Sequence, residues 1–194
     1  GPLEEIEVSG KGNGKILIIE VSGLLTSSRP NDVIDRLFNR PSLPTRFKEE
    51  LSKAAEDKKV KGIVLRINSP GGTVTASDIL HHEVLEFKKK RKIPVVACIM
   101  DLGTSGGYYL AAASDQIVAH PSAVTGSLGV IMLTINGSGL MEKIGLEART
   151  ITSGVHKDMG SPFRKMTAQD RAIFQSVIQS FYEQFLRVIE QGRP

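Results

Sequence analysis

The 194-residue chain is 40% hydrophobic and 24% charged, which is typical of one globular domain with its own core and excludes a disordered chain. Its net charge of +4 is modest and only 5% of residues are aromatic, so we expect no nucleic-acid partner. The single cysteine, Cys98, permits no intrachain disulfide, and no stretch reaches the roughly 20 apolar residues that span a bilayer.

Short β-branched runs between turn residues alternate with helical patterns along the chain. The expected strands are residues 15–21, 62–68, 94–100, 116–119, 128–133 and 147–151. The expected helices are residues 33–38, 45–57, 75–90, 105–113 and 139–144. Thr167 and Asp170 form a capping box that opens a last helix, whose apolar residues share one face: Phe174, Val177, Ile178, Phe181, Phe185 and Val188. This alternation predicts an α/β fold with parallel sheet layers covered by helices.

We expect residues 1–14 to be an N-terminal extension and residues 15–194 to be one domain. The opening Gly1-Pro2 is typical of a scar left by tag removal. Residues 24–44 are rich in Ser, Pro, Asn and Arg and are interpreted as a surface excursion. The basic run at residues 88–92 falls at a helix end, where cations complement the helix dipole. A role in binding nucleic acid or anionic lipid is the alternative interpretation of that run.

The first motif that could take part in catalysis or binding is Asn68-Ser-Pro-Gly-Gly-Thr73, between a strand and a helix. Open α/β sheets place their sites at such carboxyl ends of strands. Gly71 and Gly72 can adopt conformations closed to other residues and leave backbone N–H groups directed at a ligand. The motif indicates either an oxyanion hole or an ordinary turn with a helix cap. It is not a phosphate loop, because no Gly-Lys-Ser/Thr follows.

The second motif is Gly103-Thr-Ser-Gly-Gly-Tyr-Tyr109, directly after a strand. A serine on a glycine-flanked turn at a helix start is well placed to be a nucleophile, since substrate can approach and the positive helix end favours an oxyanion. Ser105 is therefore the candidate nucleophile, and a plain helix N-cap is the alternative.

The candidate base is Lys157, in the glycine-rich loop at residues 153–162. A lysine accepts a proton only when it is neutral, which requires burial or a low-dielectric pocket. His81, His82 and His120 are weaker candidates, because no glycine-rich turn flanks them. Ser127, in Thr125-Gly-Ser-Leu-Gly129, could hydrogen-bond the lysine amine and orient it, or could be another cap.

Taken in order, these four motifs resemble the signal peptide peptidase A (protease IV) family over residues 15–193. The resemblance implies a crotonase-like (Clp protease-like) α/β fold and peptide hydrolysis by a Ser/Lys dyad. Carried over by position, Ser105 would be the nucleophile, Lys157 the base and Ser127 its partner. The residues near the oxyanion hole would be Gly71, Gly72 and Gly106. No cofactor and no metal is expected.

The resemblance also implies substrates and partners. Members of the family degrade hydrophobic peptides such as cleaved signal peptides. An N-terminal anchor holds these enzymes at a membrane, with the peptidase domain outside the cytoplasm. We expect this chain to be soluble without that anchor, and to lack the helix and strand that usually follow in the family. Half-length members are expected to self-associate as a ring, with the lysine reaching the serine of a neighbouring protomer.

Three alternatives remain open. A crotonase-type acyl-CoA enzyme would also use an oxyanion hole, but would not need Ser105 together with Lys157. An inactive assembly scaffold of the same fold would need neither residue. The stomatin-associated membrane proteases also use a Ser/Lys dyad, but Tyr108-Tyr109 and the Thr-Gly-Ser-Leu-Gly motif fit them less well.

Overall fold

The computed structural model describes residues 4–28 and 41–193. The chain divides into two compact units, residues 1–128 with 185–194 and residues 129–184. Each unit is described by itself. The helix expected at residues 33–38 lies outside the described residues.

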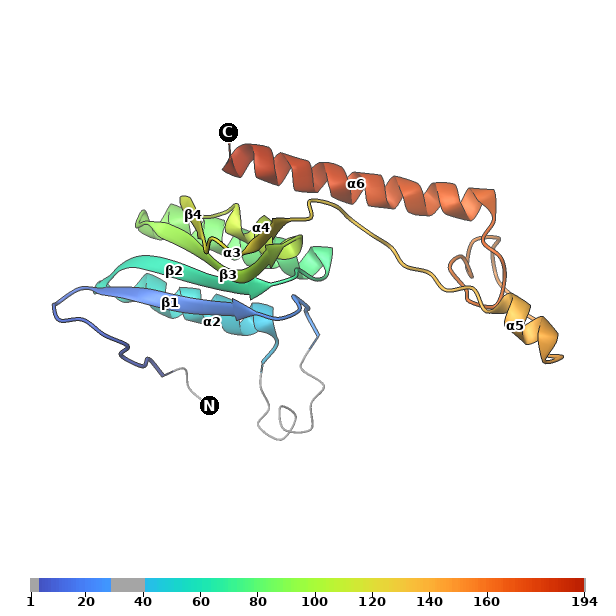
Figure 1. Ribbon diagram of the computed structural model, residues 1–194, viewed down its shortest axis with the longest axis horizontal. Helices are drawn as coiled ribbons and strands as arrows, with labels where there is room; N and C mark the ends of the chain where they lie inside the picture. Colours follow the sequence, from blue (N-terminus) through green and yellow to red (C-terminus); the bar gives the residue numbers. More distant parts are fainter. Residues whose placement is uncertain (1–3, 29–40, 194) are drawn as a thin grey trace. The chain divides into compact units, whose positions relative to one another are not determined.

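The first unit is built on a parallel sheet (Figure 1). Its strands are β1 (Lys15–Ser22), β2 (Val60–Ser69), β3 (Val95–Thr104), β4 (Gln116–Ala119) and β5 (Val124–Gly126). The sheet order is β1-β2-β3-β4, and β5 pairs with β3 beyond the end of β4. Every pairing among these strands is parallel, so the connections from β1 to β2, from β2 to β3 and from β3 to β4 must cross over the sheet. The predicted α/β fold with a parallel sheet and covering helices is confirmed.

In the described part of the chain, three helices make these crossover connections: α2 (Leu43–Glu56), α3 (Val74–Arg91) and α4 (Gly106–Ala111). Alternate residues of β2 point into the core, where Ile63, Leu65 and Ile67 are at most 1% exposed. They belong to one apolar cluster with Phe47 of α2 and Leu80 of α3. The sheet face toward these helices is therefore the core of the unit, and it fixes the strand ends from which the site is built.

The basic run at the end of α3 is largely engaged within the chain. Arg91 donates to the carbonyls of Ala54, Ala55, Asp57 and Val60, and so fastens the end of α2 to α3. Lys88 pairs with Asp115 at 2.7 Å, and Lys89 pairs with Glu86 at 2.6 Å. These contacts agree with the interpretation of the run as a helix end complemented by cations.

The second unit contains α5 (Ser138–Lys143) and the first part of α6 (Ala168–Gly192). The predicted capping box is confirmed, because the Thr167 hydroxyl accepts the Asp170 N–H at 3.0 Å and the Asp170 carboxylate accepts the Thr167 N–H at 3.2 Å. The apolar face of α6 is covered only in part: Phe185 is 5% exposed, whereas Phe181 is 38% exposed. Within the described residues, no helix has both the length and the apolar character needed to cross a bilayer.

Two of the expected strands are wrong. Residues 128–133 and 147–151 form no strand. Their β-branched residues favour extended backbone, but within the described part of the chain no strand lies beside them to complete a ladder. As a result Ile131 and Ile151 are 92% and 99% exposed. Conversely, β5 was not expected, since its residues were interpreted as a turn.

Candidate active site

Ser105 occupies a strained turn between β3 and α4. Its φ of 51° and ψ of −121° lie where side-chain-bearing residues seldom go. The turn is held on both sides: the Ser105 N–H donates to the Gly126 carbonyl at 2.8 Å, and its carbonyl accepts the Tyr109 N–H at 2.9 Å. The side chain makes no capping hydrogen bond, so the N-cap interpretation does not describe this hydroxyl. Strain of this kind accumulates at functional positions.

The two glycine motifs meet at this turn. Gly71 has a φ of +96°, and a Cβ placed on it would lie 2.6 Å from the Gly106 nitrogen and 2.9 Å from the Ser105 Cβ. Only a residue without a side chain permits that approach. A Cβ on Gly106 would in turn lie 2.1 Å from the Ser77 hydroxyl oxygen. The glycines therefore bring the β2–α3 turn directly against the β3–α4 turn.

Ser69 holds the Gly71 turn in place and was not singled out from the sequence. It is fully buried, donates to the Gly23 carbonyl at 2.6 Å and accepts the Gly71 N–H at 3.0 Å. The Gly71 N–H is thus engaged within the protein. Within the described residues, the N–H groups of Gly72 and Gly106 find no acceptor. Within that part of the chain, both groups are therefore free to donate to a ligand at this turn.

Gly72 is fixed by an isolated parallel bridge to Leu25. The bridge uses the carbonyl of Gly71, which accepts the Leu25 N–H at 2.9 Å, and the N–H of Thr73, which donates to the Leu25 carbonyl at 2.8 Å. The N–H and carbonyl of Gly72 itself therefore point away from Leu25. The Gly72 N–H is held in one direction and donates to no acceptor in the described part of the chain.

Ser127 lies close to Ser105 along the same sheet. It follows β5, which is in register with β3 so that Gly126 lies opposite Thr104. The carbonyl of Gly126 is the acceptor for the Ser105 N–H. Ser127 is exposed and has a φ of 53°. Apart from Lys92, Ser105 and Ser127 are the only non-glycine residues with positive φ in the described part of the chain.

Lys157 lies in the second unit. It belongs to a series of tight turns between residues 153 and 160, where its N–H donates to the Gly154 carbonyl at 3.2 Å. Its side chain is exposed, so the burial expected of a lysine base is not provided by the single chain. Ser105, Gly71, Gly72, Gly106 and Ser127 all belong to the first unit. The pairing of Lys157 with Ser105 stays a prediction.

Two of the histidines considered as alternative bases, His81 and His120, have local partners. His81 is 8% exposed and packs edge-on against Tyr109, with ring centroids 5.1 Å apart. Burial lowers the pKa of His81. The Nδ1 atom of His120 lies 2.8 Å from the Ser122 hydroxyl. These contacts give both rings structural roles away from the Ser105 hydroxyl.

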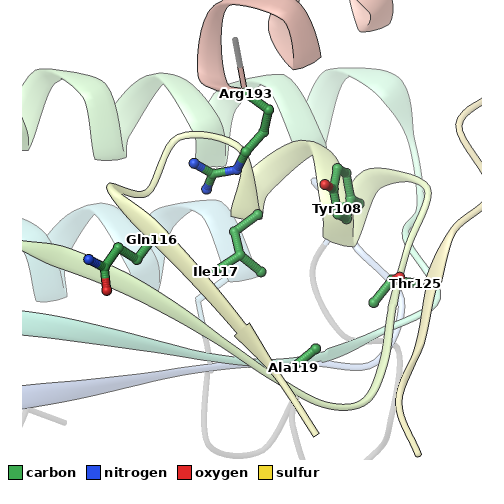
Figure 2. A pocket seen from close by; sticks show the side chains of 6 residues that line it. All are labelled: Tyr108, Gln116, Ile117, Ala119, Thr125 and Arg193. Carbon is green, nitrogen blue, oxygen red and sulfur yellow. The ribbon is translucent and has the colours of Figure 1, made fainter. Parts of the chain in front are cut away.

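An open cavity of about 540 Å³ lies beside the elements that carry the two serines. Figure 2 shows the side chains that line it, Tyr108, Gln116, Ile117, Ala119, Thr125 and Arg193. Tyr108 belongs to α4, which Ser105 precedes, and Thr125 belongs to β5, which Ser127 follows. The lining is mixed apolar and polar. It could therefore accept one side chain of a peptide.

A family comparison agrees with this geometry. The family model described as peptidase family S49 matches residues 87–194. The chain belongs to this family. It is 37% identical to a protein named "Putative signal peptide peptidase SppA" from Enterococcus faecium, over 98% of this chain and 54% of that protein. The resemblance to the signal peptide peptidase A family is confirmed.

Two further similarities complete the comparison. The chain is 35% identical to "Serine protease SPPA, chloroplastic" of Arabidopsis thaliana, over 71% of this chain and 20% of that protein. A solved structure of a mutant 1510-N membrane-bound stomatin-specific protease aligns with a TM-score of 0.46 and 14% identity, over 92% of this chain and 70% of that one. The S49 chain spans about half the length, or less, of the curated relatives it matches.

Proposed function

We propose that this S49 chain is the catalytic part of a serine endopeptidase that hydrolyses hydrophobic peptides, such as cleaved signal peptides, with a Ser/Lys dyad. The observation that carries the proposal is the strained Ser105 turn, beside which the N–H groups of Gly72 and Gly106 find no acceptor among the described residues. A nucleophile next to preorganised donors is the arrangement that acyl transfer requires.

In the proposed reaction, the Ser105 hydroxyl attacks the scissile carbonyl and gives its proton to the neutral amine of Lys157. The carbonyl oxygen becomes an oxyanion and accepts hydrogen bonds from Gly72 and Gly106. The Lys157 ammonium then protonates the departing amine, which leaves an acyl-enzyme on Ser105. Water, deprotonated by Lys157, releases the acid product and restores the serine. The Ser127 hydroxyl would orient the amine, and its place beside Ser105 on the sheet supports that role.

Self-association would complete the site, with Lys157 of one copy reaching Ser105 of the next. Lys157 is exposed in the single chain, and a lysine base needs to lose water. Apolar side chains of the second unit are also left exposed, among them Ile131, Leu133 and Ile151. Covering them with a second copy would remove that apolar surface from water. A head-to-tail contact of this kind closes into a ring when its rotation allows.

Fluorophosphonate labelling tests the chemistry directly. The proposed peptidase should be modified at Ser105, as located by peptide mass spectrometry, and Ser105→Ala should not be modified. A crotonase-type acyl-CoA enzyme or an inactive scaffold would give no labelling at this position. The proposal would be rejected if the folded protein is not labelled and also does not hydrolyse hydrophobic peptides.

Complementation tests the shared site. Ser105→Ala and Lys157→Ala subunits would be dissociated, mixed and reassembled, with mixed rings verified by native mass spectrometry. A site formed between copies should regain activity wherever an intact serine faces an intact lysine. Mixed rings that stay inactive would place the dyad within one chain.

A further inference from the structure

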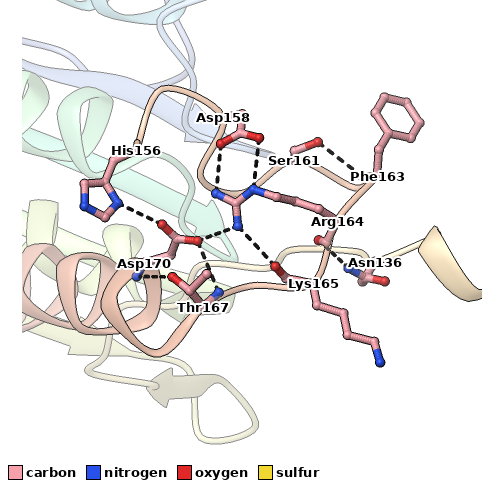
Figure 3. A network of polar contacts seen from close by, with 9 residues as sticks. All are labelled: Asn136, His156, Asp158, Ser161, Phe163, Arg164, Lys165, Thr167 and Asp170. Carbon is pink, nitrogen blue, oxygen red and sulfur yellow. Dashed lines mark hydrogen bonds and ion pairs between the residues drawn. The ribbon is translucent and has the colours of Figure 1, made fainter. Parts of the chain in front are cut away.

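The two residues that flank Lys157 are both anchored, although Lys157 itself is exposed. The His156 Nδ1 atom lies 3.0 Å from one carboxylate oxygen of Asp170. On the other side, Asp158 receives a two-pronged contact from Arg164, with both Nε and Nη2 at 2.9 Å from its carboxylate oxygens. Figure 3 shows these contacts converging at the start of α6.

Arg164 and Asp170 join the two anchors into one network. The Arg164 Nη1 atom donates to Asp170 at 2.6 Å, and the Asp170 side chain is only 1% exposed. The same carboxylate closes the capping box with Thr167, so the network is attached to the first turn of α6. Arg164, followed by His156, holds the pKa of Asp170 well below its usual range. Asp170 therefore stays ionised and paired across the pH range in which a peptidase would work.

The loop is also held from outside the network. A Cβ on Gly160 would lie 3.1 Å from the ring of Phe174, which places the end of the loop against α6. The Asn136 side chain donates to the Arg164 carbonyl at 2.6 Å. The loop before α6 is thus fastened on several sides, and only Lys157 is exposed between its two anchors.

We propose that Arg164, with Asp158 and Asp170, is a positioning residue for Lys157: it fixes the backbone on both sides of the base. This inference rests on the proposed function of Lys157. A lysine has a long flexible side chain, and a general base must lie within hydrogen-bond reach of the proton it takes. Because His156 and Asp158 are both held, backbone motion no longer adds to the flexibility of the Lys157 side chain. A misplacement of about 1 Å can cost about 100-fold in rate.

The test uses Arg164→Lys, which keeps the charge but cannot reproduce the planar fork on Asp158 together with the bond to Asp170. We expect kcat for peptide hydrolysis to fall about 10- to 100-fold with KM unchanged, because the base is displaced while substrate binding is not. Asp158→Asn, which removes the charge that the fork recognises, should also lower kcat.

The matched control is Arg91→Lys. Arg91 also donates several hydrogen bonds, but to carbonyls at the end of α2 in the first unit. Arg91→Lys should leave kcat unchanged, whatever it does to the melting temperature. Circular dichroism establishes that each variant is folded. If Arg164→Lys does not fold, the milder Asp158→Asn decides the question.

A double mutant separates positioning from a general loss of structure. In the Lys157→Ala background, Arg164→Lys should not slow fluorophosphonate labelling of Ser105 further, since its effect passes through the lysine. Wild-type kcat in Arg164→Lys, or a further loss of labelling in the double mutant, would overturn this inference alone. Full activity in Lys157→Ala would overturn the proposed function, and the inference with it.

Discussion

Replacement of Gly71 by alanine tests the close approach of the two turns. A side chain at a φ of +96° costs about 1–3 kcal/mol in backbone strain. The new Cβ would also meet the Gly106 nitrogen at 2.6 Å, and overpacking of this kind adds about 1–3 kcal/mol. The free energy of unfolding should therefore fall by about 2–6 kcal/mol in total. Because the clash displaces the donors of the proposed oxyanion hole, kcat should fall about 10²- to 10³-fold.

Gly145→Ala is the matched control. Gly145 has a φ of +72°, but nothing lies within 4 Å of a Cβ placed there. In Gly145→Ala, the free energy of unfolding should fall only by the cost of backbone strain, and kcat should equal that of the wild type. Urea denaturation gives both free energies of unfolding, and hydrolysis of a hydrophobic peptide gives kcat. Equal losses of stability in the two variants, or wild-type turnover in Gly71→Ala, would show that the turns do not touch as described.

The site and its surroundings support three more predictions. Ser105→Ala and Lys157→Ala should each abolish peptide hydrolysis without changing circular dichroism, because nucleophile and base act as one unit; normal turnover in either would reject the dyad. The rate should rise with pH, because the proposed base accepts the serine proton only in its neutral form; a flat profile, with chemistry rate-limiting, would remove Lys157 from the base role. Burial lowers the pKa of His81 in the folded chain, so the unfolded chain binds a proton at this residue more readily than the folded chain does. The free energy of unfolding should therefore fall as the pH drops below about 6.5, and His81→Phe should lose that component; an unchanged pH dependence would contradict it.

The sheet of the first unit could be predicted because its signals are local. β1, β2 and β3 are apolar runs that end at glycine or serine turns, and the α3 pattern between them is long. β5 could not be predicted, because its strand character comes from pairing with β3 and not from its own three residues. The runs at 128–133 and 147–151 show the reverse, since they have strand-like side chains but no partner strand in the described part of the chain.

The candidate site also has features that could be predicted from the sequence and features that could not. The glycine motifs could be recognised because paired glycines directly after a buried strand indicate a turn that needs close backbone approach. Their meeting at Gly71 and Ser105 is what the neighbouring ends of parallel strands produce. The role of Ser69 could not be predicted, because its acceptor on Gly23 lies 46 residues away. The capping box of Asp170 was visible in the sequence, but its bonds to Arg164 and His156 depend on how the loop folds back on α6.

The predicted machinery is rigid in two separate ways. The proposed nucleophile and the glycine donors are held by a buried parallel sheet, whose strand ends cannot move without disturbing the core. The neighbours of the proposed base are held by an ionic network at a helix start, with little apolar packing around it. Each arrangement lacks what the other supplies, because the first has no proposed base and the second has no proposed nucleophile. If the dyad forms as proposed, catalysis is controlled at the step that joins them, and a change that weakens this step should abolish turnover while both parts stay folded.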